Sequence, residues 1–136
     1  MAHPDIARSI TWIYAHDLAV AARFYGEVLG LELAAEQTGE NGGGCRIFRQ
    51  GPASYVGVCQ VRPGRFVEPK GVIVSFVTPD VAGWHRHLTA HGVIPEGAPR
   101  YSEAYGVTGF MAKDPNGYML EFQTFPGLGV FGKTAD

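Results

Sequence analysis

Hydrophobic and polar positions along this chain follow the same order of patterns twice. The stretch 9–15, SITWIYA, is rich in β-branched and aromatic residues and is predicted to be a strand. After Asp17, apolar residues recur every three or four positions up to Leu29, which predicts one amphipathic helix ending at Gly30. Three short strands are then expected, separated by the turn sequences GENGGG and QGPAS, at 31–36, 44–49 and 55–61.

The second half of the chain repeats this plan. A strand is predicted at 72–77, followed by a helix that Thr78 caps, Pro79 begins and Gly92 ends. Further strands are expected at 93–95, 107–112 and 118–125.

The pattern therefore predicts an α+β fold of two tandem βαβββ modules. These are residues 8–62 and 71–125, joined by a linker at 63–70 and followed by a tail at 126–136, within one domain spanning 1–136. A single module would leave one apolar sheet face uncovered, so the two curved mixed sheets are expected to enclose a shared cavity.

Composition and charge exclude several classes of partner. Apolar residues make up 46% of the chain, enough for a core, but no run is long enough to span a membrane. The formal net charge is −2 with both signs scattered, so no nucleic-acid surface is expected. The N-terminal stretch lacks a secretory pattern, which favours a cytoplasmic location. Cys45 and Cys59 are accordingly expected to be reduced, in preference to a disulfide across a hairpin.

The main candidate for chemistry is Glu121, in the stretch 114–122, DPNGYMLEF. This stretch begins as a turn, and the strand after it carries Met119, Glu121 and Gln123 on one face. The alternate residues are apolar and are expected to pack beneath a helix. A carboxylate facing a cavity is costly unless it meets a cation, a metal ion or hydrogen-bond donors.

Two stretches resemble the vicinal oxygen chelate superfamily, which includes glyoxalase I, bleomycin-resistance and fosfomycin-resistance proteins and extradiol dioxygenases. The stretch 17–33, DLAVAARFYGEVLGLEL, is similar to the first helix of that family, and DPNGYMLEF is similar to its final turn and strand. With the doubled plan, the resemblance covers about residues 8–125. It implies the glyoxalase/bleomycin-resistance/dioxygenase fold and a homodimer, which the apolar tail residues Leu128, Val130 and Phe131 would fit by packing on the domain or on a second subunit.

The resemblance also allows a comparison with the metal-dependent members, in which Glu121 would be one of about four ligands of a divalent cation. The other three places fall at Ile10, at Val72 or Ile73, and at Val58 or Gly57. None of these side chains binds a metal ion. We therefore expect no cofactor and no complete metal site, with a divalent metal as the less favoured alternative.

The predicted cavity is apolar and aromatic, and suits a small hydrophobic or aromatic ligand. Its face of the strand at 55–61 is expected to carry Val56, Val58 and Gln60. The predicted ligand-binding residues are Trp12, Tyr14, Gln60, Met119 and Gln123. Trp12 is as well suited to filling a closed core as to stacking on a ligand, and for Met119 and Val58 the core is favoured.

Glu121 has three candidate roles, given in order of preference. It contacts the ligand, or it is a structural carboxylate bonded to Tyr14, Gln60 or a backbone amide, or it is catalytic as a general base. The corresponding functions are binding a small molecule, with a metal-dependent lyase, isomerase or dioxygenase and an antibiotic-sequestering protein as alternatives.

Two histidines, one loop and two arginines are further candidates for a functional role. His87 and His91 have the i, i+4 spacing that can bind a metal, but a surface role is favoured because the helices are expected to cover the outside of the sheets. The polar loop 97–106 is expected at the rim of the cavity. Either Arg46 or Arg49 is expected to face the cavity, where it would pair with Glu121 or with an anionic ligand.

Overall fold

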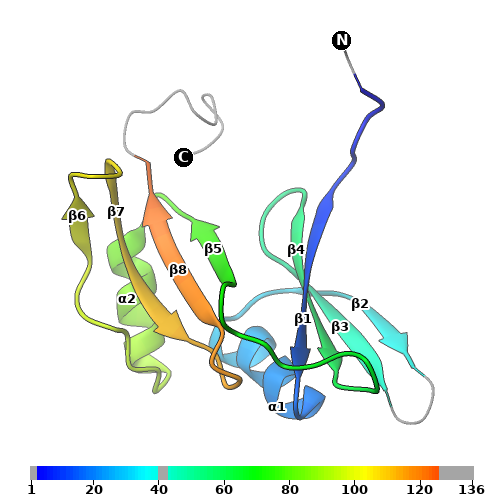
Figure 1. Cartoon of the computed structure of the whole chain (residues 1–136). Coiled ribbons are helices and arrows are strands. Elements are labelled where there is room, and N and C mark those ends of the chain that lie inside the picture. The colour runs from blue at the N-terminus through cyan, green and yellow to red at the C-terminus, as the bar shows by residue number, and fades with distance from the viewer. Residues whose placement is uncertain (1–2, 40–42, 126–136) are drawn as a thin grey trace. The chain divides into compact units, whose positions relative to one another are not determined.

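The computed structural model describes residues 3–39 and 43–125, and the chain divides into two compact units, Met1–Glu68 and Pro69–Asp136. Each unit has the order strand, helix, three strands (Figure 1). The predicted α+β architecture of two βαβββ modules is confirmed. The predicted tail, with Leu128, Val130 and Phe131, lies outside the described residues, as does the middle of the GENGGG turn.

The first unit contains one four-stranded mixed sheet. Its strand order is β1-β4-β3-β2, in which β1 pairs with β4 in parallel and the other neighbours are antiparallel. The elements are β1 (Ser9–Ala15), α1 (Leu18–Arg23), η1 (Phe24–Val28), β2 (Leu33–Thr38), β3 (Gly44–Arg49) and β4 (Ser54–Gln60).

The single helix predicted after Asp17 changes its winding halfway. The Asp17 carboxylate caps α1 by accepting the backbone N–H of Ala19 at 3.0 Å. From Phe24 the helix continues as the π-helix η1, in which Leu29 donates its N–H to the Phe24 carbonyl at 2.8 Å. Phe24 and Tyr25, the first two residues of η1, are both buried.

The second unit repeats the topology with the order β5-β8-β7-β6, and β5 pairs with β8 in parallel. Its elements are β5 (Ile73–Val77), α2 (Val81–Ala90), β6 (Arg100–Ser102), β7 (Val107–Lys113) and β8 (Met119–Thr124).

Two predictions for this unit were wrong. Asp80, not Thr78, caps α2 by accepting the Gly83 N–H at 2.9 Å, and Thr78 instead accepts the Asp80 N–H at 3.1 Å. The stretch 93–95 is not a strand, since it ends in a proline that cannot donate to a ladder. The edge strand is β6, which lies inside the predicted loop 97–106.

In each unit the helix packs on one face of its sheet, which we call the helix face, and the opposite face is the far face. In the first unit, Val56 and Val58 on the helix face are fully buried, as is Tyr25 of η1. In the second unit, Phe122 stacks with Trp84 of α2 at a centroid distance of 5.0 Å, and Leu88 is also fully buried. No helix in the described part of the chain is long and apolar enough to cross a membrane.

The turn before β8 is built around the buried carboxylate of Asp114. Its Oδ1 accepts the backbone N–H groups of Asn116 at 2.8 Å and Tyr118 at 3.0 Å. Gly117 adopts a φ of 87°, a conformation that glycine tolerates best. These contacts fix where β8 begins, and therefore which of its residues face the helix.

Replacing Asp114 with Ala should lower the free energy of unfolding by about 1–3 kcal/mol, because two backbone donors lose their acceptor in a buried place. Asp114→Asn keeps an oxygen in that position and should cost less. Urea denaturation of both variants checks this, and a D114A protein as stable as the D114N protein would contradict it.

Candidate functional site

Glu121 lies on the far face of the second sheet, as the strand alternation predicts, together with Met119 and Gln123. Its Oε1 accepts a hydrogen bond from Gln123 Nε2 at 2.8 Å and one from Ser75 Oγ at 3.3 Å. Gln123 Nε2 also donates to Ser75 Oγ at 2.7 Å. The three side chains form a closed triad that holds one carboxylate oxygen in place. The partners of Glu121 are thus Ser75 and Gln123, rather than Tyr14 or Gln60.

Sequence reasoning missed Ser75. Ser75 is the one polar residue in the stretch 72–77, VIVSFV, and this exception in an apolar strand could have marked it as a site residue. Its place beside Glu121 depends on the parallel register of β5 and β8, in which Ser75 is opposite Glu121. That register joins segments far apart in the sequence, so local patterning does not specify it.

A cavity of about 410 Å³ lies beside this triad on the second unit. Its lining is largely apolar and includes Val72, Ile73, Met111 and Met119, with Lys70 as the charged member. Met111 is the cross-strand partner of Glu121, so the cavity and the carboxylate are neighbours on the same face. Met119 is the predicted site residue that lines this cavity.

On the first unit, Trp12 lies across Gly57 on the far face of the sheet. The two residues are register partners, and a Cβ added to Gly57 would come within 2.4 Å of the Trp12 ring. The absence of a side chain at Gly57 therefore lets the indole lie against the β4 backbone. The Trp12 residue is still 42% exposed, so a broad aromatic surface remains accessible.

The expected orientation of β4 was wrong by one residue. The register pairs Trp12 with Gly57 and Tyr14 with Cys59, so these residues share the far face. Val56 and Val58 are fully buried on the helix face instead. The alternation of residues within β4 does not show which set shares a face with Trp12. The register between β1 and β4 decides this.

Gln60 has a structural task at the start of α1. Its Oε1 accepts the Leu18 N–H at 2.9 Å, and its Nε2 donates to the His16 carbonyl at 2.7 Å. Both ends of the amide thus hold the connection between β1 and α1. Gln60 also lines the cavity described next.

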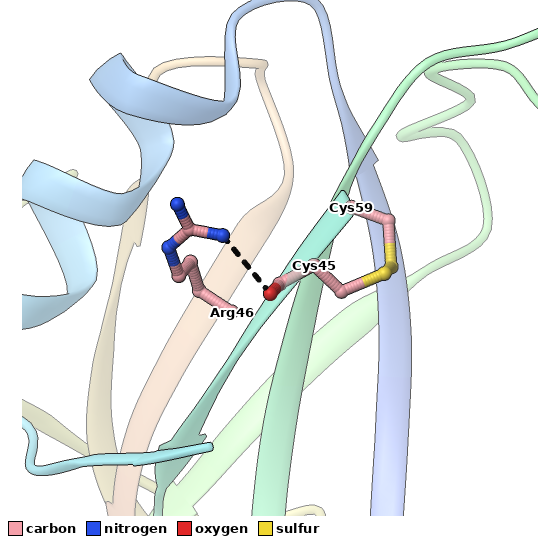
Figure 2. The surroundings of a disulfide bond; sticks show 3 residues. All are labelled: Cys45, Arg46 and Cys59. Carbon is pink, nitrogen blue, oxygen red and sulfur yellow. Dashed lines mark hydrogen bonds between the residues drawn. A yellow bond between two sulfur atoms is a disulfide. The ribbon is translucent and has the colours of Figure 1, made fainter. Parts of the chain in front are cut away.

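A second cavity, of about 760 Å³, lies at the end of the first sheet and is lined by Tyr14, Gln60 and the two cysteines, among others. Cys45 and Cys59 are cross-strand partners and form a disulfide, shown in Figure 2. The expectation of reduced cysteines was therefore wrong. The hairpin of β3 and β4 places them directly opposite each other, at a Cα–Cα distance of 4.1 Å.

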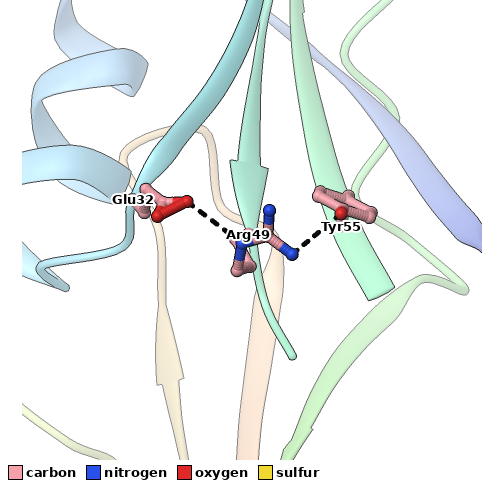
Figure 3. A network of polar contacts seen from close by, with 3 residues as sticks. All are labelled: Glu32, Arg49 and Tyr55. Atoms are coloured by element: carbon pink, nitrogen blue, oxygen red, sulfur yellow. Dashed lines mark hydrogen bonds and ion pairs between the residues drawn. The ribbon is translucent and has the colours of Figure 1, made fainter. Parts of the chain in front are cut away.

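The two arginines of β3 point to opposite faces. Arg46 extends away from the disulfide (Figure 2) and forms an ion pair with Glu36 at 3.0 Å. Arg49 lies between Glu32 and Tyr55 (Figure 3), with contacts of 3.0 Å to the carboxylate and 2.9 Å to the phenol oxygen. The hydrogen bond to Glu32, followed by the interaction with Tyr55, raises the pKa of Arg49 above its ordinary value. Arg49 is the arginine on the far face, and Glu32 already partners it.

The predicted site residues divide between the units. Tyr14 lines the first cavity with Gln60, and Trp12 lies on the same far face as Tyr14. In the second unit, the structure brings together Met119, Glu121 and Gln123 on one face.

Comparison with known proteins agrees with this architecture. The family described as Glyoxalase/Bleomycin resistance protein/Dioxygenase superfamily matches residues 5–122, and the chain belongs to this superfamily. No curated protein sequence is significantly similar to the chain.

Solved structures show the same fold at low sequence identity. TnmS3, an antibiotic binding protein from Streptomyces sp. CB03234, is 22% identical with a TM-score of 0.72, over 91% of this chain and 98% of that one. A glyoxalase/bleomycin resistance protein from the same organism is 22% identical with a TM-score of 0.69, over 85% and 97%. A glyoxalase/bleomycin resistance protein/dioxygenase from Nocardioides is 19% identical with a TM-score of 0.68, over 94% and 89%.

In the described part of the second unit, the neighbours of Glu121 on the far face offer one hydroxyl, one amide and thioethers, but no second carboxylate or imidazole. Within residues 3–39 and 43–125, no group of three or more His, Cys, Asp or Glu residues is placed to hold a metal ion. A hard cation needs more oxygen ligands than this face supplies.

Gly57→Ala should displace the Trp12 indole and lower the free energy of unfolding by about 1–3 kcal/mol, because the new methyl group overlaps the ring. In a Trp84→Phe background, Trp12 is the remaining tryptophan, so Gly57→Ala should shift the emission spectrum of the protein.

The matched control is the same Gly57→Ala change in a Trp12→Ala protein, where the cost should largely disappear. An equal cost in both backgrounds would show that strand backbone effects, and not the indole, explain the loss.

Proposed function

We propose that this protein binds a small hydrophobic or aromatic molecule on the far face of a sheet, without the complete metal site of the metal-dependent members of its superfamily. The single observation that carries the proposal is the exposed Trp12 indole lying across Gly57. The indole is 42% exposed and lies flat on the sheet, so it presents an aromatic surface on which a flat ligand would stack.

Glu121 supports the proposal as an orienting group. Ser75 and Gln123 bond its Oε1, and no other hydrogen bond or ion pair of Glu121 occurs in the described part of its unit. Its other oxygen, Oε2, is therefore suited to accept a hydrogen bond from a hydroxyl or amine of the ligand. The apolar cavity lined by Met111 and Met119 would receive the adjoining hydrocarbon. Contact with the ligand thus remains the favoured role of Glu121, ahead of a general base.

An antibiotic-sequestering function is the second candidate, and the similarity to TnmS3 favours it. That protein is an antibiotic binding protein with the same fold. A sequestering protein needs a binding surface but no reacting group, which the far faces with their aromatic and thioether side chains satisfy. Turnover of a bound ligand would separate an enzyme from a sequestering protein.

The ligand-orienting role of Glu121 is tested with two probes of nearly the same shape, 2-naphthol and 2-methoxynaphthalene. Only the naphthol has a hydroxyl hydrogen to donate. Glu121→Gln should weaken naphthol binding about tenfold, because a hydrogen bond to a charged acceptor is lost, and should leave binding of the ether nearly unchanged. Calorimetric titration provides both affinities.

Ser75→Ala should weaken naphthol binding in the same direction but less, since Gln123 still holds the carboxylate. Equal effects of Glu121→Gln on both probes would remove Glu121 from the orienting role. Metal analysis of protein purified without chelator tests the rival function: a stoichiometric divalent metal that is lost in the E121Q protein would favour a metal-dependent lyase, isomerase or dioxygenase.

A further inference from the structure

We propose that His87 and His91 on α2 form a binding site for a transition-metal ion of the Zn²⁺, Ni²⁺ or Cu²⁺ type. Imidazole nitrogen is a preferred ligand of these ions, whereas Mg²⁺ and Ca²⁺ prefer oxygen. The site is separate from the proposed function. Glu121 lies on the far face of the second sheet, whereas α2 packs on its helix face through Trp84.

The two rings are already next to each other. His87 and His91 are one helical turn apart, their ring centroids are 4.2 Å apart, and their planes are inclined by 30°. Pairs of histidines at i and i+4 on a helix are a known way to present two nitrogens to one ion. To bind one ion, the two rings must turn from this stacked arrangement until one nitrogen of each lies at the Zn–N distance of about 2.0–2.1 Å.

His91 also has the supporting hydrogen bond that metal-binding histidines use. Its Nδ1 lies 2.8 Å from the carbonyl oxygen of His87. A carbonyl only accepts hydrogen bonds, so Nδ1 carries the hydrogen in this contact and the lone pair of the neutral ring is on Nε2. A ligating imidazole typically donates its other ring N–H to such an oxygen, which fixes the tautomer and the ring.

The end of the helix adds a favourable field for a cation. His91 is the C-terminal cap of α2, and His87 lies in the last turn. Backbone carbonyls at this end carry partial negative charge, which attracts positive charge. Among the described residues no third His, Cys, Asp or Glu is grouped with the pair, so water would complete the coordination of the proposed site.

The chain supplies both a reporter and a matched control. The Trp84 ring lies 5.3 Å from the His87 ring, so Ni²⁺ bound at the pair should quench Trp84 fluorescence. His85 is on the same helix, but its Nε2 is 3.2 Å from the Gly97 carbonyl and its ring lies edge-on to Phe110. Replacing His85 therefore removes an imidazole from the helix without touching the proposed pair.

The experiment titrates Ni²⁺ into an untagged His3→Ala, Trp12→Phe protein, so that the chain start does not compete for metal and Trp84 is the reporting tryptophan. We expect saturable quenching that excess Zn²⁺ reverses. His91→Ala and His87→Ala should abolish the saturable quenching, while His85→Ala should retain it. His91 is exposed, so H91A should keep the fold, which circular dichroism verifies.

Three results would overturn the site. These are no saturable quenching in the parent protein, retained quenching in a folded H91A protein, or a loss in the H85A protein equal to that in the H91A protein. Because the readout is metal binding at α2, failure here leaves the ligand proposal for Trp12 and Glu121 unaffected.

Discussion

The parallel pairing between the first and last strands of each module is the constraint on which the rest of this structure depends. Side chains alternate across a sheet, so the register of β1 with β4 and of β5 with β8 decides which residues the helices bury. In the second unit it places Phe122 beneath α2 and Glu121 on the opposite side. A shift of one residue would exchange these two side chains, burying a carboxylate under Trp84.

The turn at Asp114 fixes where β8 begins in its hairpin with β7. Its carboxylate binds the N–H groups of the turn before β8 begins, so the strand starts at a defined residue. In the first unit, Gln60 has a comparable role by joining the end of β4 to the start of α1. Polar side chains thus position strands whose apolar residues then provide most of the stabilisation.

On the far faces the same registers assemble groups that can contact a ligand. Gly57 and Trp12 meet because β1 and β4 are paired, and the missing side chain of the glycine makes room for the indole. Ser75 and Glu121 meet because β5 and β8 are paired, and Gln123 closes the triad. The two modules share a topology but carry different chemistry, aromatic in one and polar with thioethers in the other. Each far face, taken by itself, thus offers a surface for the proposed binding of a small molecule.

The sequence by itself determined the doubled βαβββ plan, the positions of most strands, the helix ends at Gly30 and Gly92, and the side of β8 that carries Glu121. These follow from local physics: side-chain periodicity, turn residues and glycine conformation act over a few residues. The partner of Glu121, the facing of β4, the Cys45–Cys59 disulfide and the edge strand β6 were decided by tertiary structure alone. The partner of Glu121 and the facing of β4 depend on a strand that is distant in the sequence and on its register. The disulfide and β6 depend on the exact register of a hairpin between consecutive strands, which residue patterning does not specify either.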